Sequence, residues 1–336
     1  MKAVAYTHAR PADDPDALQD LELPEPAAPR GHELLVEVRA VSVNPVDTKV
    51  RRDSDPLGEP KVLGYDAAGV VRAAGPEASL LRVGDEVYYA GSIDRPGTNA
   101  ALHLVDERIV ARKPRSLSFA EAAALPLTAV TAWEALFDRL EIPRGGAGDG
   151  TALLIVGGAG GVGSIAIQLA RRLTGLRVIA TASRPETREW CLALGAHDVV
   201  DHAGDLPAQM KALEVAPRYV FSTNTTGRNW KSIADIVAPQ GRVALIEAQA
   251  VVDVRDVMRK SVSVHCEWMF TRPVFDTPDK VAQHRLLEEV ASLVDRGVLR
   301  TTMAEHFGRI TAANLLRAHA AVEAGKVRGK IVLEGF

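Results

Sequence analysis

The feature that most constrains this chain is a cluster of glycines within "IVGGAGGVGSIAIQLARR" at residues 155–172. Gly158, Gly160 and Gly163 form a G-x-G-x-x-G pattern that follows an apolar run and opens a segment with helical spacing. In that context the first glycine permits a tight turn, the second lets the backbone approach a pyrophosphate, and the third lets the helix pack on the strand. The pattern therefore predicts a dinucleotide-binding loop. The alternative is a tight turn that binds nothing.

The end of the next predicted strand distinguishes NADH from NADPH. A site for NAD usually places Asp or Glu about 20 residues after the loop, to hold the ribose 2′-hydroxyl. This chain has Ser183 and Arg184 there, and a hydroxyl with a guanidinium favours the 2′-phosphate of NADPH. We therefore predict NADPH as the cofactor, with Gly161 and Val162 among the residues that bind it. The alternative for Arg184 is a solvated loop charge.

Strands and helices alternate through the middle of the chain. Such alternation is typical of βαβ units and predicts a doubly wound parallel sheet of the Rossmann type. Helices are predicted at 163–173 and 186–194, and the last strand, which we expect at the edge of the sheet, at 261–268. The other predicted strands are 152–158, 177–183, 198–202, 219–223 and 242–248.

The two ends of the chain follow a different pattern. Residues 1–115 are predicted to be rich in strands, and Ser118 and Glu121 form a capping box for a helix that Pro126 interrupts. After about residue 270 two amphipathic helices and a final strand return to the N-terminal part. We therefore predict an α/β protein with a β-rich domain made of 1–125 and 271–336, and an inserted NADPH-binding domain at 126–270. The predicted elements of the outer domain are 33–43, 67–75, 83–91, 108–114, 279–299, 312–325 and 329–336.

Composition excludes several classes of function. The 336 residues are 47% hydrophobic and 25% charged with a net charge of −3, which gives no argument for nucleic-acid binding as the main function. No apolar run approaches the roughly 20 residues of a membrane helix, and the absence of a signal-peptide pattern predicts a cytoplasmic protein. Cys191 and Cys266 cannot supply a four-thiolate zinc site, and we expect both to be buried. His8, His32 and His103 lack metal-ligand spacing and are interpreted as surface or turn residues.

Several long motifs resemble the medium-chain dehydrogenase/reductase superfamily, over essentially the whole chain. Within it the chain resembles the quinone oxidoreductase branch, in the subgroup called zinc-type alcohol dehydrogenase-like. The resemblance implies a GroES-like catalytic domain and NADPH-dependent reduction of quinones, enones or related carbonyls. The motifs that carry it are "VSVNPVDTKVRR" (41–52), "VLGYDAAGVV" (62–71), "ALPLTAVTAWEAL" (124–136), "GGAGGVGS" (157–164), "EWMFTRP" (267–273) and the closing "GKIVLEGF".

The chain departs from the zinc enzymes of that superfamily at their metal ligands. A Cys ligand is replaced by Asn44, a Gly-His-Glu triplet by Gly64-Tyr65-Asp66, and the last Cys by Leu127 or a neighbour. Asp66 alone cannot supply the three protein ligands of a catalytic zinc site. We therefore predict no bound metal and interpret "zinc" in the subgroup's name as inherited.

Without zinc, another group must stabilise the negative charge that hydride transfer leaves on a quinone or enone oxygen. The residues that replace the metal ligands are our candidates, namely Asn44 as an amide donor and Tyr65 as a donor of a hydrogen bond or proton. By the same resemblance Asp47 orients the loop or a substrate group. The alternatives are a turn residue for Asn44, a core aromatic for Tyr65 and a structural role for Asp66.

Two more cofactor contacts come from the resemblance. Thr131 matches a threonine at the nicotinamide end, and His202 matches an aromatic residue beside the adenine. The alternatives are an ordinary helix hydroxyl and a surface histidine. The sequence thus predicts a homodimeric, zinc-independent NADPH-dependent reductase of a small quinone or carbonyl substrate. A non-catalytic NADPH-binding sensor or structural protein is the alternative, and a zinc alcohol dehydrogenase is disfavoured.

Overall fold

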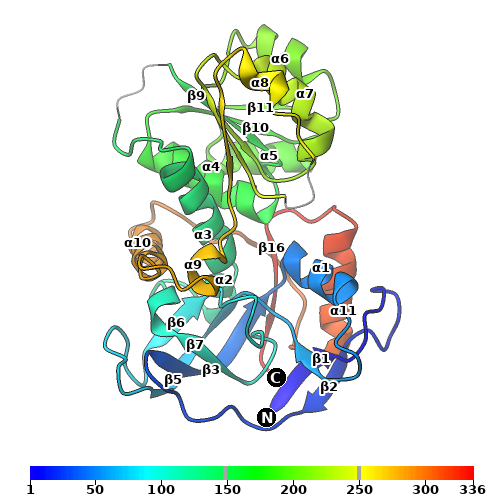
Figure 1. Ribbon diagram of the computed structural model, residues 1–336, viewed down its shortest axis with the longest axis vertical. Helices are drawn as coiled ribbons and strands as arrows, with labels where there is room; N and C mark the ends of the chain where they lie inside the picture. Colours follow the sequence, from blue (N-terminus) through cyan, green and yellow to red (C-terminus); the bar gives the residue numbers. More distant parts are fainter. Residues whose placement is uncertain (147–149, 248–250) are drawn as a thin grey trace. The chain divides into compact units, whose positions relative to one another are not determined.

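A parallel six-stranded sheet forms in the middle of the chain (Figure 1). The structure, a computed structural model, describes residues 1–146, 150–247 and 251–336. The strands lie in the order β11-β10-β9-β12-β13-β14. β9 is buried over its whole length, as expected for a central strand covered on both faces. The strands are β9 (Ala152–Val156), β10 (Arg177–Thr181), β11 (Asp198–Val200), β12 (Tyr219–Ser222), β13 (Arg242–Leu245) and β14 (Ser263–Cys266).

The prediction of a Rossmann-type sheet is confirmed, and so is the edge position of the last strand. The predicted strand 242–248 ends earlier, at Leu245, and residue 248 lies outside the described residues. The helices of this part are α4 (Gly161–Leu173), α5 (Pro185–Leu194), α6 (Leu206–Ala212), α7 (Thr226–Ile236) and α8 (Arg255–Met258), with a π-helical turn at Glu134–Arg139.

The rest of the chain forms mainly antiparallel sheets. The larger one has the order β15-β16-β3-β5-β6-β8, with β7 also paired to β3. A smaller sheet has the order β2-β1-β4. The strands are β1 (Lys2–Tyr6), β2 (Gln19–Glu22), β3 (Glu33–Ser42), β4 (Lys61–Val62), β5 (Ala67–Ala74), β6 (Glu86–Tyr89), β7 (Leu102–Asp106), β8 (Val110–Arg112), β15 (Met303–His306) and β16 (Lys330–Glu334).

The helices that the sequence predicts beside these sheets are present, although the one predicted at 279–299 spans only Ala282–Asp295. Ser118 and Glu121 form the expected capping box, and the chain makes two helices on either side of the predicted break near Pro126. Gly325, with φ +65°, follows the second C-terminal helix. The helices are α1 (Pro45–Asp53), α2 (Phe119–Ala123), α3 (Pro126–Trp133), α9 (Thr271–Val274), α10 (Ala282–Asp295) and α11 (Ala312–Glu323), with a 3₁₀ turn at Glu107–Ile109.

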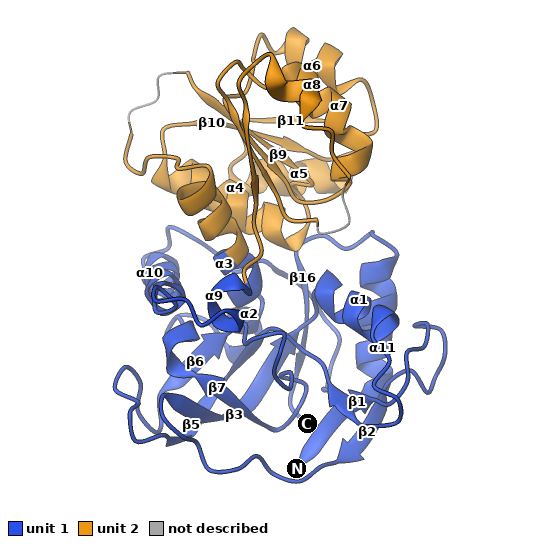
Figure 2. Cartoon of the chain, in the orientation of Figure 1, with its two compact units in different colours: residues 1–130, 270–336 blue, residues 131–269 orange. Residues whose placement is uncertain are grey.

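The C-terminal strand returns to the N-terminal sheet, where β16 pairs antiparallel with β3. The chain accordingly divides into unit 1, residues 1–130 and 270–336, and unit 2, residues 131–269 (Figure 2). The sequence placed these divisions at 125/126 and 270/271. Each unit has an apolar core of its own, which in unit 1 includes Leu34, Tyr89 and Leu333.

Two minor predictions are wrong. His103 is buried, with Nδ1 3.1 Å from the Tyr89 hydroxyl and Nε2 2.9 Å from the Pro96 carbonyl oxygen, and burial lowers its pKa to about 4. Cys191 is buried as expected, but Cys266 is exposed because it lies on the edge strand. Among the described helices, none has the length and apolar character needed to cross a bilayer.

Candidate functional site

The glycine-rich loop lies at the switch point of the parallel sheet. β9 has β10 on one side and β12 on the other, so the strand order reverses there. A Cβ atom on Gly157 would meet the Thr223 hydroxyl at 2.5 Å, which places the loop after β9 against the loop after β12. Ligands of doubly wound sheets bind outside the carboxyl ends of the strands at this point.

The structure corrects the role of the first glycine in the pattern. The left-handed residue of the turn is Gly157, with φ +82°, and not Gly158. Gly158 is needed for packing, because its Cβ would lie 2.7 Å from that of Ala180. Gly163 also serves packing, since its Cβ would lie 2.3 Å from the Gly157 carbonyl oxygen. The sequence contained a signal for this role, because Gly157 directly follows the apolar strand and precedes the first glycine of the pattern.

Gly160 differs from these neighbours because a Cβ there has space. Its closest contact would be the Gly157 carbonyl oxygen at 3.6 Å. Gly160 is the N-cap of α4, and Gly161 and Val162 begin that helix. The first N–H groups of a helix lack intrahelical partners, and with the helix dipole they favour an anion. The loop therefore offers an open backbone surface that suits a pyrophosphate.

Ser183 and Arg184 follow β10, as predicted. Ser183 is exposed and Arg184 is half-buried at the N-cap of α5. The Arg184 Nε lies 3.1 Å from a carboxylate oxygen of Glu186, in the first turn of the helix. Sequence reasoning missed this ion pair. Glu186 competes in it for the Arg184 guanidinium, which is the group that would bind a 2′-phosphate. The partners are exposed enough for water to screen the pair.

Thr131 and His202 lie in different parts of unit 2. Thr131 is buried on α3 and has interactions with its surroundings. His202 follows β11, and its buried Nδ1 has no hydrogen-bond partner among the described residues. Burial lowers the pKa of His202, so the neutral ring is favoured. A neutral imidazole with an unused ring nitrogen suits a contact with a heteroaromatic ligand.

The predicted catalytic residue Asn44 belongs to a buried polar cluster in unit 1. Its centre is the Asp66 carboxylate, which is wholly buried. Its Oδ2 accepts hydrogen bonds from the Ser42 hydroxyl at 2.8 Å and from the Asn44 amide at 2.7 Å, while its Oδ1 accepts from the Leu127 N–H at 2.7 Å. Asn44 and Leu127, two positions that match zinc ligands in the sequence, thus meet in space around one carboxylate.

A lysine that sequence reasoning missed completes this cluster. The Lys330 ammonium, 3% exposed on β16, donates to Asp66 Oδ2 at 3.1 Å and to the Val43 carbonyl oxygen at 2.9 Å. It also donates to the Asn44 side-chain oxygen. Burial raises the pKa of Asp66, and the Lys330 charge opposes that shift. The available signal was a lysine directly before the apolar run of the closing strand, in "KIVL".

Asn44 and Asp47 are tied to backbone as well. Asp47 Oδ2 accepts from the Asn44 N–H at 2.6 Å and Oδ1 from the Gly64 N–H at 3.1 Å. Burial raises the pKa of Asp47 to about 7, although these two N–H groups oppose the shift. Asp47 therefore connects the start of α1 to the turn that holds Tyr65, and the side chain of Asn44 is engaged by Asp66 and Lys330.

Tyr65 is the one predicted catalytic residue whose functional group is not engaged in this way. Its ring is buried and packs edge-on against Phe270, with ring centroids 5.5 Å apart. No hydrogen bond joins its hydroxyl to any residue that the structure describes. Burial raises the pKa of Tyr65 above its ordinary value, with the Asp47 charge adding to the effect. The phenol therefore stays protonated and can donate.

The cluster does not fit a zinc ion. Catalytic zinc is held by cysteine, histidine and carboxylate ligands, three of them from the protein. Here the converging side chains offer one carboxylate, whose two oxygens accept four hydrogen bonds from Lys330, Asn44, Ser42 and Leu127. Within the described ranges, no three His, Cys, Asp or Glu side chains gather as ligands. The Lys330 ammonium supplies the positive charge at this place instead.

Comparisons with known proteins agree with both halves of this arrangement. Residues 30–123 match the alcohol dehydrogenase GroES-like domain, and residues 161–283 match the zinc-binding dehydrogenase family. A zinc-type alcohol dehydrogenase-like protein of Staphylococcus aureus is 42% identical over 91% of each chain.

Solved structures give the same picture. A protein of Rhizobium etli, provisionally named a zinc-dependent alcohol dehydrogenase, is 60% identical and superposes with a TM-score of 0.96 over 100% of this chain and 98% of that one. The Escherichia coli quinone oxidoreductase, solved as a complex with NADPH, is 26% identical with a TM-score of 0.83 over 99% of this chain and 100% of that one.

Proposed function

The chain belongs to the medium-chain dehydrogenase/reductase superfamily of oxidoreductases, and from this premise we propose that it is an NADPH-dependent, zinc-independent reductase of quinones, enones or related carbonyls. The observation that carries the proposal is the combination of an open glycine loop in unit 2 with a buried cluster of Asp66 and Lys330 in unit 1. The first suits a dinucleotide, and the second has no set of metal ligands. The Escherichia coli quinone oxidoreductase, a relative in both sequence and fold, supports the choice of cofactor and acceptor.

The residues present fit NADPH. Gly160, Gly161 and Val162 would hold the pyrophosphate with main-chain N–H groups at the start of α4. Ser183 and Arg184 would hold the 2′-phosphate through charge-assisted hydrogen bonds, with Arg184 giving up part of its pairing with Glu186. When bound, NADPH supplies the hydride that reduces the acceptor.

Two further residues complete the proposed cofactor contacts. His202 would approach the adenine through the ring whose Nδ1 lacks a partner among the described residues. Thr131, buried on α3, would contact the nicotinamide end. These two assignments rest on the match to family positions, with the geometry of His202 as added support.

Charge stabilisation on the acceptor falls to Tyr65 in this proposal. Hydride arriving at a conjugated carbonyl leaves an enolate or a phenolate, which needs a hydrogen-bond donor or a proton. The Tyr65 phenol is protonated and uncommitted among the described residues, whereas the Asn44 amide already donates to Asp66. We therefore assign Tyr65 as the donor, with Asn44 as a second contact through its remaining N–H.

Asp47 and Asn44 also act as positioning residues. The Asp47 carboxylate holds the Gly64 N–H at the turn that directly precedes Tyr65. Asn44 is held in turn by Asp66 and Lys330, so its side chain keeps one orientation. A donor that is already oriented has a lower reorganisation free energy during the reaction than one that must be ordered at each turnover.

The experiment is steady-state oxidation of NADPH with a panel of ortho-quinones and enones. We expect turnover with at least one acceptor. Tyr65→Phe should lower kcat by about 10²-fold, the scale of losing one donor to a developing oxyanion, and leave the KM for NADPH unchanged. The matched control is Tyr88→Phe, because the Tyr88 hydroxyl donates to the Leu287 carbonyl oxygen elsewhere in unit 1.

Two results would contradict the proposal. Tight binding of NADPH without turnover on any acceptor would instead support a non-catalytic NADPH-binding protein. Equal losses in Tyr65→Phe and Tyr88→Phe would mean that the Tyr65 hydroxyl is structural.

A further inference from the structure

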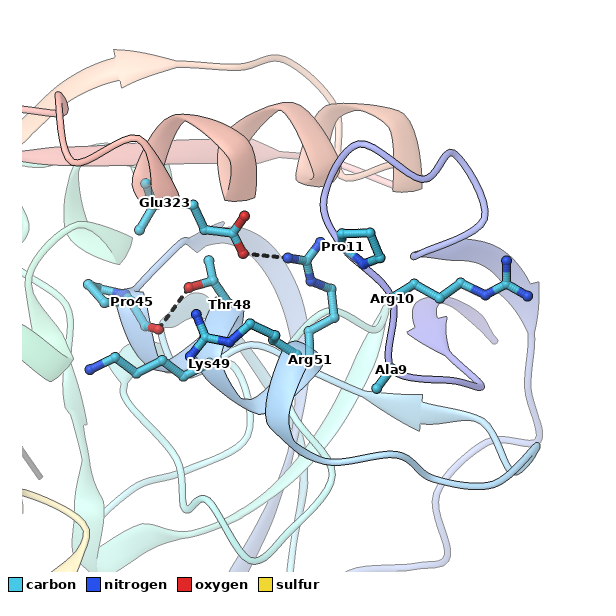
Figure 3. Close-up of a pocket in the computed structure, with 10 residues that line it drawn as sticks. Ala9, Arg10, Pro11, Pro45, Thr48, Lys49, Arg51 and Glu323 are labelled. Carbon is cyan, nitrogen blue, oxygen red and sulfur yellow. Dashed lines mark hydrogen bonds and ion pairs between the residues drawn. The ribbon is translucent and has the colours of Figure 1, made fainter. Parts of the chain in front are cut away.

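Unit 1 contains a pocket that the proposed reaction does not use. It has a volume of about 520 Å³ and lies among α1, α11 and the N-terminal segment 9–11 (Figure 3). Pockets of this size hold small molecules. α1 and α11 pack side by side here although they are far apart in the sequence (Figure 1). We refer to this cavity as the α1–α11 pocket.

The lining of the α1–α11 pocket is strongly cationic. Its charged residues are Arg10, Lys49, Arg51 and Arg52 against one acid, Glu323. Arg10 pairs with Asp14 at 2.9 Å and Arg52 with Asp53 at 2.7 Å, and these pairs are partly exposed to solvent. Lys49 makes no ion pair with any residue in the described part of the chain. With Arg10 and Arg52 paired to acids outside the lining, Lys49 and Arg51 against the single acid Glu323 still leave an excess of positive charge, which favours an anionic ligand.

Arg51 is the unusual member of this lining. Its side chain is 1% exposed, and only Nη2 has a partner, the carboxylate of Glu323 on α11. Nε and Nη1 are buried without a hydrogen-bond partner among the described residues. Figure 3 shows the guanidinium reaching from α1 toward Glu323, with Pro11 beside it. Buried donors without a partner are costly, so native proteins satisfy them with protein, water or ligand.

His319 adds a second buried polar group beside Arg51. It lies on α11, is 0% exposed, and neither ring nitrogen has a partner within the described ranges. Burial lowers its pKa to about 3, and the Arg51 charge acts in the same direction. The ring is therefore neutral and does not neutralise the guanidinium. The Arg51 Nε and Nη1 donors are therefore still without a partner among the described residues.

We propose that the α1–α11 pocket binds the phosphate group of a small metabolite, or free phosphate, with Arg51 and Lys49 as its principal donors. A phosphate has enough acceptor oxygens to take the Arg51 donors that Glu323 leaves unused and still reach Lys49. Glu323 competes with the ligand for Arg51. This site is separate from the dinucleotide loop of unit 2 and does not depend on the proposed reaction.

The test is titration calorimetry of the full chain with inorganic phosphate, with a phosphate monoester of glycerol, and with acetate. Wild type should bind both phosphates in preference to acetate. Glu323→Gln should tighten phosphate binding by about tenfold, because it removes the competing charge and leaves a shape that Arg51 can still contact. Lys49→Met should weaken binding about fivefold, while Lys211→Met, which removes a charge on α6, should leave it unchanged.

Arg184→Ala separates this site from the dinucleotide loop, where phosphate could also bind. If phosphate binding survives Arg184→Ala and responds to Glu323→Gln, the α1–α11 pocket is the site. A preference for the monoester over free phosphate would assign a metabolite as the ligand. Loss of binding in Arg184→Ala, an unchanged affinity in Glu323→Gln, or equal binding of acetate would overturn the proposal. So would a crystal structure grown with phosphate that shows only water against Arg51.

Discussion

Replacement of Lys330 by methionine tests whether the buried cluster of unit 1 is held by one cation. Lys330→Met keeps most of the side-chain volume and removes the ammonium group that donates to Asp66, Asn44 and the Val43 carbonyl. The change leaves the Asp66 carboxylate wholly buried without its ion-pair partner. We therefore expect a large loss of stability from a substitution that creates almost no cavity.

The structure sets the size of the effect. Removing one partner of a buried ion pair costs about 3–5 kcal/mol, because the remaining charge stays desolvated. Asp66 keeps its hydrogen bonds from Ser42, Asn44 and Leu127, so we expect the lower end, about 3 kcal/mol. For a unit of this size, each kcal/mol shifts the melting temperature by roughly 2–4 °C. The expected loss is therefore roughly 6–12 °C in the melting transition of unit 1.

The loss should also depend on pH. Burial raises the pKa of Asp66, and Lys330 opposes that shift, so the pKa should rise further in the variant. A carboxyl group whose pKa is raised in the folded state is most favourable below its unfolded pKa, and that contribution is lost as pH rises through the folded pKa. Differential scanning calorimetry should thus find a smaller difference between wild type and Lys330→Met at pH 5 than at pH 8.

Lys330→Met/Asp66→Asn is the control, because it removes the stranded charge and keeps the shape of the side chain. It should recover part of the lost stability, and the recovery should be larger at pH 8 than at pH 5, because the amide that replaces the Asp66 carboxylate carries no charge at either pH. A single-variant loss below about 1 kcal/mol would place the pair in the range of exposed salt bridges and refute the reasoning. Equal deficits at both pH values, or no recovery in the double variant, would refute it too.

Four more predictions follow from the two units. Gly160→Ala should fold normally and lose cofactor affinity. Gly163→Ala should lower the melting temperature, because the added Cβ would lie 2.3 Å from a backbone oxygen. Equal effects of the two variants on melting temperature and affinity would contradict this. Arg184→Ala should raise the KM for NADPH about tenfold with little change for NADH, and Ser183→Asp should go further, since a carboxylate repels the 2′-phosphate; kinetics with both cofactors would show it, and equal losses would count against the assignment. The exposed edge strand β14 predicts a homodimer, and light scattering that finds only monomer at micromolar concentration would refute it. Elemental analysis should find well under one zinc per chain, and activity should be retained in the presence of a chelator. One zinc per chain that the chelator removes together with the activity would refute this.

Much of unit 2 could be predicted because its signals are local. The glycine loop, the apolar strands and the helices between them are patterns among residues close in the sequence, and their alternation permits few topologies. The same holds for Ser118 and Glu121, whose capping box joins side chains three residues apart. The misassigned role of Gly158 shows the limit, because only the backbone conformation tells which of two adjacent glycines is left-handed.

The polar cluster of unit 1 could be located only in part. The replaced ligand positions pointed to Asn44, Tyr65 and Asp66, but not to what Asp66 binds. Nothing in the local sequence links Asp66 to Lys330, which lies 264 residues away. His103 was misjudged for a similar reason, since its burial depends on Tyr89 and on the sheet packed around it.

The sequence by itself determined the class of fold and the position of the glycine-rich loop, because both depend on residue types at short spacing. The resemblance to the superfamily identified the positions at which its zinc ligands are replaced. Only the tertiary structure decided which charges meet. It paired the last strand, β16, with β3, and this pairing brought the Lys330 ammonium to the Asp66 carboxylate. A buried ion cannot remain without a partner, so the fold as a whole, and no local pattern, had to provide one.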